Sequence, residues 1–102
     1  MDRVQNLFLQ KIAFIRERVC VLAHRPLTED DIVALGEIGM TRSPSAAIRF
    51  SALWLSLHRP DLYRDQMLTT AIGQAVRWIA AAKRDEGEAA ARALVEKWEE
   101  GL

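Results

Sequence analysis

The sequence has little cysteine, the residue that forms stabilising disulfide bonds in many small proteins. It contains one cysteine, Cys20, so no disulfide can form within the chain. A chain of 102 residues can bury a single hydrophobic core without a disulfide or a structural metal. An unpaired cysteine is typical of the reducing cytoplasm, and we expect the protein to be cytoplasmic.

Long apolar runs are also missing. The uncharged stretch from Phe50 to Leu57 is far too short to span a bilayer, so we expect no membrane interaction. The N-terminal residues MDRVQNLFLQK lack both a long apolar core and a cleavage site of small residues. This composition argues against a signal peptide.

Residues that commonly carry chemistry are few and scattered. The two histidines, His24 and His58, are not at metal-ligand spacing from each other or from Cys20. We expect the Cys20 thiol to be packed beside a buried face. None of the five glycines forms a phosphate-binding loop. The adjacent acidic residues 29–31 stand at a predicted helix start, where they favour the positive end of the helix dipole. We therefore expect no catalytic residue, no metal site and no cofactor, and predict that the protein is not an enzyme.

The charges cancel overall but are unevenly distributed. Residues 39–84 carry seven basic and two acidic side chains, a net charge of +5. Residues 85–102 carry two basic and six acidic side chains, a net charge of −4. A basic middle and an acidic end can attract each other within the fold or between two chains. The alternative interpretation is that these charges lie on the solvent-exposed sides of amphipathic helices and have no further role.

Apolar residues recur at helical spacing through most of the chain. This periodicity predicts an all-α fold, with residues 1–102 forming a single compact bundle of four to five helices. The predicted helices span residues 3–23, 28–38, 44–58, 62–83 and 86–100. One alternative stays open, because Val19 and Val21 would suit a short strand within residues 18–25.

Several helix boundaries have local signals. Thr28 followed by Asp31 is a capping-box pattern, and Gly39 is expected to end that helix in the left-handed conformation. Asp61 is expected to cap the fourth helix, and Asp85 stands at the start of the fifth.

The predicted helix over residues 44–58 has a capping residue, Ser43, and a proline, Pro44, at its first position. It is apolar around most of its circumference, which is typical of a helix in the middle of a bundle. Its one arginine, Arg49, lies on a narrow stripe of small side chains. Three hypotheses for Arg49 follow, in this order: an ion pair inside the fold with an acid such as Glu37, an anchor at a protein interface, and a contact with nucleic acid.

Residues 28–58 also have the length and rough shape of a helix-turn-helix. The hydroxyl groups of Thr41 and Ser45, together with Arg42 and Arg49, are suited to contacts with phosphates and bases. Against this hypothesis, a recognition helix presents a polar face to the groove, and this helix offers only its narrow stripe.

The Arg42-Ser43 pair, followed by Ile48, resembles the start of the second helix of ribbon-helix-helix regulators. The resemblance covers about residues 26–63. It implies DNA binding through a strand near residues 18–26.

The most economical prediction is a non-enzymatic helical interaction module: a bacterial-type adaptor, subunit or regulator. It would act by binding a protein partner or a second copy of itself. The alternative is a DNA-binding regulator that uses residues 28–58. The candidate partner-binding residues are Thr41, Arg42, Ser45, Arg49, Arg59 and Arg64.

Overall fold

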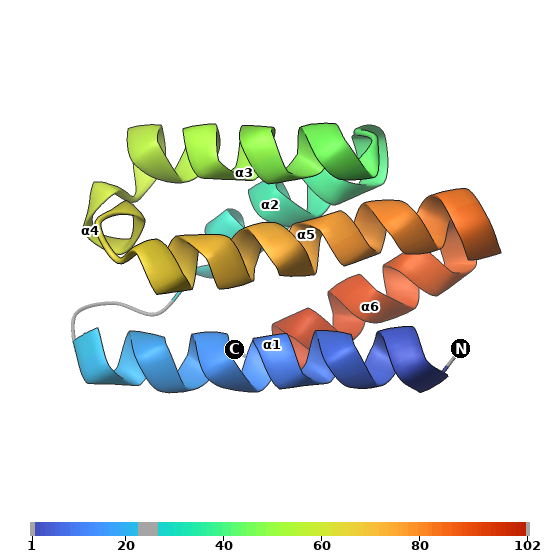
Figure 1. Cartoon of the computed structure of the whole chain (residues 1–102), viewed down its shortest axis with the longest axis horizontal. Helices are drawn as coiled ribbons and strands as arrows, with labels where there is room; N and C mark the ends of the chain where they lie inside the picture. The colour runs from blue at the N-terminus through green and yellow to red at the C-terminus, as the bar shows by residue number, and fades with distance from the viewer. Residues whose placement is uncertain (1, 23–26, 102) are drawn as a thin grey trace.

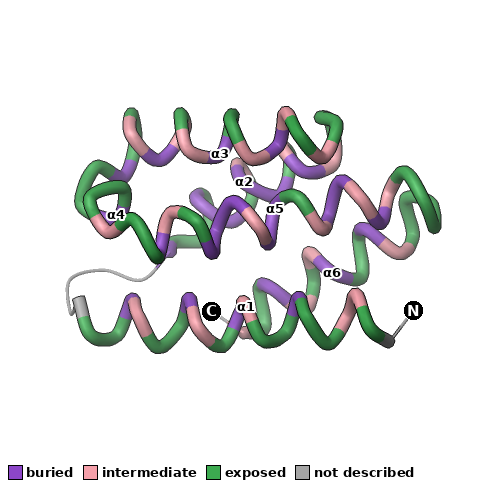
Figure 2. The backbone as a smooth tube through the Cα atoms, viewed as in Figure 1, coloured by how far each residue is buried: buried purple, intermediate pink, exposed green. Residues whose placement is uncertain are grey.

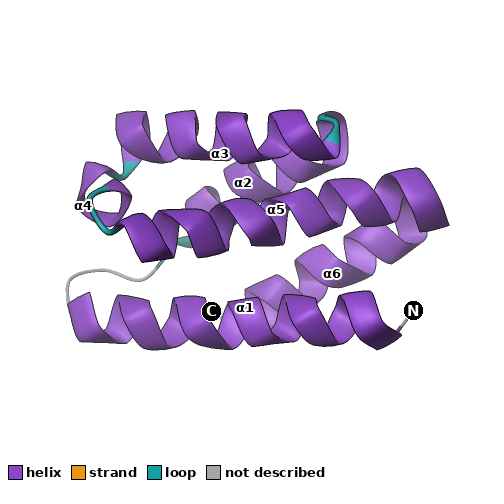
Figure 3. Cartoon of the chain, viewed as in Figure 1, coloured by secondary structure: helices purple, strands orange, loops and turns teal. Residues whose placement is uncertain are grey.

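The computed structural model describes residues 2–22 and 27–101, and six helices account for nearly all of that part of the chain (Figure 1). The helices are α1 (Asp2–Leu22), α2 (Glu29–Thr41), α3 (Pro44–His58), α4 (Pro60–Tyr63), α5 (Gln66–Glu86) and α6 (Glu88–Gly101). The described residues contain no strand (Figure 3), which confirms the all-α class with more helices than the expected four to five. None of these helices combines the length and the apolar character needed to cross a membrane.

Helix α5 is the centre of the bundle. It packs against every other helix, with α3 on one side of it and α1 and α6 on the other (Figure 1). Its buried residues are Leu68, Ala71, Ile72, Gly73, Ala75, Val76, Ile79, Ala80 and Ala82. Because many of these side chains are small, neighbouring helices can approach α5 closely from several directions.

The prediction that residues 44–58 form the central helix is wrong. Helix α3 buries only Ala47, Ser51 and Leu55. The buried parts of α3 are on the side that faces α5 (Figure 2). A Cβ atom placed on Gly73 of α5 would lie 3.5 Å from Oγ of Ser51, so the two helices cross at small residues. Three of the six large apolar side chains of α3, those of Phe50, Leu53 and Leu57, are left exposed.

Helix α2 begins as predicted but ends later. Oγ1 of Thr28 accepts a hydrogen bond from the Asp31 amide at 3.1 Å, and Oδ2 of Asp31 accepts one from the Thr28 amide at 3.0 Å, which confirms the capping box. Gly39 does not end the helix, which continues to Thr41. A Cβ atom on Gly39 would lie 2.8 Å from Cγ2 of Ile79, so this glycine permits a close crossing of α2 and α5.

The predicted helix over residues 62–83 is two helices. A single turn, α4, comes first, and the long helix α5 follows after a bend. Asp65, rather than Asp61, caps α5, because Oδ1 of Asp65 accepts a hydrogen bond from the Leu68 amide at 2.9 Å.

The predicted helix over residues 86–100 is α6, which begins after Gly87. The φ angle of Gly87 is 97°, a conformation that favours glycine and separates α5 from α6. Trp98 of α6 is fully buried and meets the ring of Phe8 of α1 edge-on, with ring centres 6.4 Å apart. Residues 18–22 belong to α1, and the rest of the segment for which a strand was an alternative lies outside the described residues.

Candidate functional site

The six candidate residues fall at two ends of α3. Thr41, Arg42 and Ser45 lie around the turn between α2 and α3, with Arg49 one helical turn further along. Arg59 and Arg64 follow the other end of α3, which is about 22 Å away at the rise of an α-helix. The structure therefore does not bring all six residues into one site.

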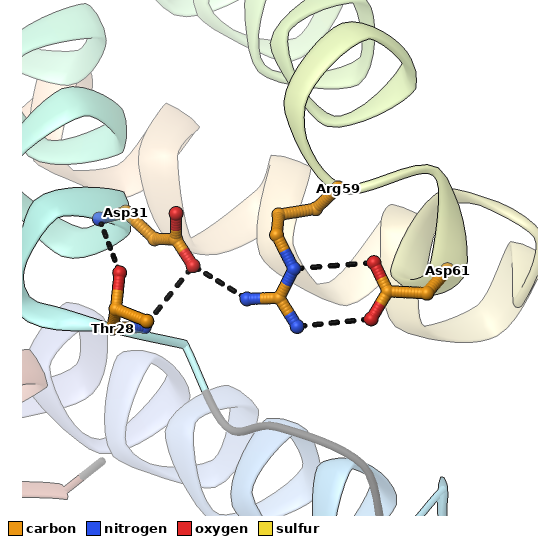
Figure 4. Close-up of polar contacts among 4 residues, drawn as sticks. All are labelled: Thr28, Asp31, Arg59 and Asp61. Carbon is orange, nitrogen blue, oxygen red and sulfur yellow. Dashed lines mark hydrogen bonds and ion pairs between the residues drawn. The ribbon is translucent and has the colours of Figure 1, made fainter.

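Arg59 belongs to the interior rather than to a binding surface. Its side chain is 7% exposed and lies between two carboxylates (Figure 4). Nη1 donates to Oδ2 of Asp31 at 2.5 Å, while Nε and Nη2 donate to the two oxygens of Asp61 at 3.1 and 3.0 Å. Because Asp31 also closes the capping box of α2, this cluster ties the start of α2 to the junction between α3 and α4. The structure therefore gives Arg59 a role inside the fold.

The same contacts set the protonation of the cluster. The hydrogen bonds from Arg59 hold the pKa of Asp61 below its ordinary value, and the positive charge of the guanidinium acts in the same direction. Those hydrogen bonds also raise the pKa of Arg59 above its ordinary value, although burial of the guanidinium opposes the change. Both groups are therefore charged at neutral pH, as a paired internal cluster requires.

Arg49 has the opposite environment. It is exposed on α3 and makes no ion pair with any residue that the structure describes. The first hypothesis for this residue, an ion pair inside the fold, is therefore wrong. The physical reason is the rotation of α3, which turns Ala47, Ser51 and Leu55 inward and leaves Arg49 exposed on its stripe of small side chains.

A stripe of apolar side chains runs along the outer side of α3. We define the outer stripe as Ala46, Phe50, Leu53 and Leu57. The exposed fractions are 37% for Phe50, 53% for Leu53 and 68% for Leu57. At about 100° per residue these four positions share one side of the helix. Exposed apolar side chains gathered in this way are typical of interaction sites.

Aromatic and basic groups border the outer stripe. The guanidinium carbon of Arg42 lies 4.3 Å from the centre of the Phe50 ring, a cation–π contact. Near the other end of the helix, the rings of Trp54 and His58 stack with their centres 4.8 Å apart. Arg49 precedes Leu53 by one turn, so a partner on the stripe would meet cationic groups at its margin.

A groove with a volume of about 570 Å³ lies between α2 and α6. Val33, Met40 and Val95 provide its apolar part, and Glu37, Glu96 and Glu99 provide three carboxylates beside a single arginine, Arg92. Thr41 also lines this groove, and its hydroxyl donates to the carbonyl oxygen of Glu37 at 2.7 Å. The groove and the outer stripe therefore differ in the sign of their charge.

The other candidate groups are dispersed. Cys20 is exposed, so the expectation that it packs beside a buried face is wrong. His24 lies outside the described residues. Among the residues that the structure does describe, no three His, Cys, Asp or Glu side chains come together in a group that could hold a metal ion.

Sequence reasoning missed the outer stripe as a surface. Because residues 44–58 are apolar nearly all round, their pattern predicts a helix in the middle of the bundle and not one with an exposed apolar side. A signal for the correct orientation was present in the small residues Ala47 and Ser51, four positions apart, which match the alanines and glycine of α5. Small residues on both helices favour a close crossing.

Comparisons with models of known protein families, with curated proteins and with solved structures each found no match to this chain.

Proposed function

We propose that this chain is a non-enzymatic helical interaction module, an adaptor, subunit or regulator that binds another protein through the outer stripe of α3. The observation that carries the proposal is the exposure of Phe50, Leu53 and Leu57 on one side of a helix whose other side completes the fold. We place the protein in the cytoplasm, since its only cysteine is unpaired and exposed.

The composition around the stripe supports a protein partner. Phenylalanine, tryptophan and arginine are enriched in protein interfaces, and here Phe50, Trp54, Arg42 and Arg49 lie on or beside the stripe. Helix α6 does not cover this side, because it packs on α5, α1 and α2. A partner can therefore reach the stripe without displacing part of the fold.

The alternative is a DNA-binding regulator that uses the turn between α2 and α3. The observation that favours it is the exposure of Thr41, Arg42, Ser45 and Arg49 around that turn. Protein–DNA interfaces are polar and strongly positive, so they would leave Leu53 and Leu57 without a role. For that reason we prefer the protein partner.

Differential capture tests the proposal. The protein, its Leu53→Asp variant and a control variant, Gln10→Asp on the exposed side of α1, are immobilised and exposed to nuclease-treated extract at about 50 mM and about 200 mM salt. We expect the wild type and the control to retain the same proteins at both salt concentrations. Leu53→Asp should not retain these proteins. Equal retention by all three would contradict the proposal. A parallel capture uses extract without nuclease treatment. Nucleic acid that is retained there at about 50 mM salt and lost at about 200 mM salt would favour the alternative.

A further inference from the structure

The outer stripe has the spacing of one side of a helical seam. Ala46, Phe50, Leu53 and Leu57 are separated by four, three and four residues, the alternation that places apolar side chains along a helix–helix contact. From residue 46 to residue 57 the helix rises about 17 Å, which corresponds to about three turns. The shape that matches this surface is therefore a second helix of similar length.

The charge beside the stripe defines the partner further. Between Glu37 and Asp61 the chain has no acidic residue, whereas Arg42 and Arg49 are both exposed there. The Asp61 carboxylate already pairs with Arg59 through both of its oxygens. An incoming helix would thus meet two guanidinium groups at the margin of an apolar surface.

We infer that the outer stripe of α3 binds an amphipathic helix of a partner protein whose apolar side is flanked by glutamate or aspartate. This inference rests on the proposed function and adds the chemistry of the partner. Carboxylates at those margins pair with Arg42 and Arg49, and arginine favours carboxylates through its planar set of donors. The apolar side of the partner covers Phe50, Leu53 and Leu57.

A second copy of the chain is a poorer match. If two α3 helices met along their outer stripes, Arg42 and Arg49 of both copies would surround one apolar seam, and neither α3 carries a carboxylate. Like charges brought together at an interface are unfavourable. The acidic helix α6 has no large exposed apolar side chain among the described residues, so it cannot replace the partner's apolar side.

Two designed peptides test the inference. Each is about three turns long, is held helical by a side-chain lactam, and carries leucines at the seam positions; one has glutamate and the other lysine beside the leucines. Their affinities are measured by fluorescence anisotropy for the wild type, Arg49→Glu, Leu53→Asp and the control Gln10→Asp. Circular dichroism confirms that each variant is folded.

We expect the wild type and the control to bind the glutamate peptide about tenfold more tightly than the lysine peptide at low salt, since two exposed ion pairs are involved. Arg49→Glu should reverse or abolish this preference, and Leu53→Asp should weaken both peptides. The preference should shrink as salt rises, because exposed charges are screened.

Other results would overturn the inference in distinguishable ways. If both peptides bind equally and Leu53→Asp weakens both, the proposed function is retained. The inference that the partner is acidic is then rejected. Absence of binding, or binding that ignores Leu53→Asp, would reject the stripe as a helix-docking site. A dimer in light scattering that Leu53→Asp converts to a monomer would assign the stripe to a second copy of this chain.

Discussion

Arg49 and Arg59 both belong to the basic middle of the chain, yet only Arg59 is part of the folded interior. Two carboxylates, from Asp31 and Asp61, surround the guanidinium of Arg59. Arg49 is exposed and has no ion-pair partner among the described residues. Removing a partner from a buried ion pair leaves an uncompensated charge, whereas an exposed charge remains hydrated when its surroundings change.

We expect Arg59→Met to reduce the free energy of unfolding by about 3 kcal/mol, because it leaves Asp31 inside the fold without its counter-charge. Arg49→Met should change it by less than about 0.5 kcal/mol. Urea denaturation followed by tryptophan fluorescence measures both. A larger loss for Arg49→Met than for Arg59→Met would reverse the roles assigned to the two arginines.

The carboxylate of Asp65 makes stability depend on pH. The Leu68 amide, which donates to it at the start of α5, is the main reason its pKa lies below the ordinary value, and Arg18 at 2.6 Å adds to the effect. A lowered pKa in the folded state means that the unfolded chain binds the proton more tightly. The stabilisation is therefore complete above about pH 5 and is lost as pH falls below about 4 toward the folded pKa.

We accordingly expect Asp65→Asn to lose less unfolding free energy than the wild type when the pH is lowered from neutral to acid. Arg18→Met should keep most of the wild-type dependence, since the backbone amide contributes more than Arg18 does. Urea titrations at a series of pH values test this. An Asp65→Asn curve that parallels the wild type would show that another group is responsible.

At the scale of the helices, local chemistry was sufficient to predict several starts. The capping box at Thr28 and the Ser43–Pro44 start are where the sequence placed them, because each depends on residues within one turn. The split between α4 and α5 was missed, because Asp61 and Asp65 have equally good capping patterns. Only the tertiary contact with Arg59 assigns Asp61 to another role.

The rotation of α3 was the part that hydrophobic periodicity could not provide. Helix α3 is apolar nearly all round, so its periodicity does not distinguish the side that packs from the side that is exposed. The choice depends on the shape of α5, whose small residues accept Ala47 and Ser51. Arg42 and Arg49 could be named as candidates from their charge in the sequence, whereas the outer stripe beside them could not, because it depends on this rotation.

The crossing of α2 and α5 gives a test at this scale. A Cβ atom on Gly39 would lie within 3.0 Å of both Ile79 and the carbonyl oxygen of Val76, so Gly39→Ala should destabilise the fold by about 1–3 kcal/mol. At Gly36 the nearest atom to such a Cβ, Cγ1 of Val95, is 3.4 Å away. Gly36→Ala should therefore be neutral or stabilising by up to about 1 kcal/mol, because alanine has a higher helix propensity than glycine.

Thermal unfolding of the two glycine variants against the wild type measures this difference. Both changes add one methyl group to the same helix, so propensity alone would affect them equally. Stabilisation of the fold by both substitutions would show that α2 and α5 are not held at this close distance.

For the molecule as a whole, the fold leaves two surfaces of different charge. The outer stripe lies beside arginines, and the groove between α2 and α6 is rich in glutamate. Helix α6 packs on α5, α1 and α2 and not along α3, so the acidic end does not cover the outer stripe within one chain. The stripe can therefore bind a partner while the core around α5 remains intact.

This separation predicts different effects for two leucines of α3. Leu55 is fully buried, and Leu55→Ala should reduce the free energy of unfolding by about 3 kcal/mol. Leu53 is 53% exposed, and Leu53→Ala should reduce it by less than about 1 kcal/mol. Equal losses in chemical denaturation would mean that the outer stripe is part of the core.

Site-specific photo-crosslinking from position 53, in cells that produce the protein, measures most directly whether the outer stripe of α3 is a protein-binding surface. A photoreactive amino acid replaces Leu53 in one variant and Gln10, exposed on α1, in a control. We expect a discrete protein adduct from position 53 and none of that mass from position 10. Adducts to DNA from position 53, or identical adducts from both positions, would contradict a protein-docking role for α3.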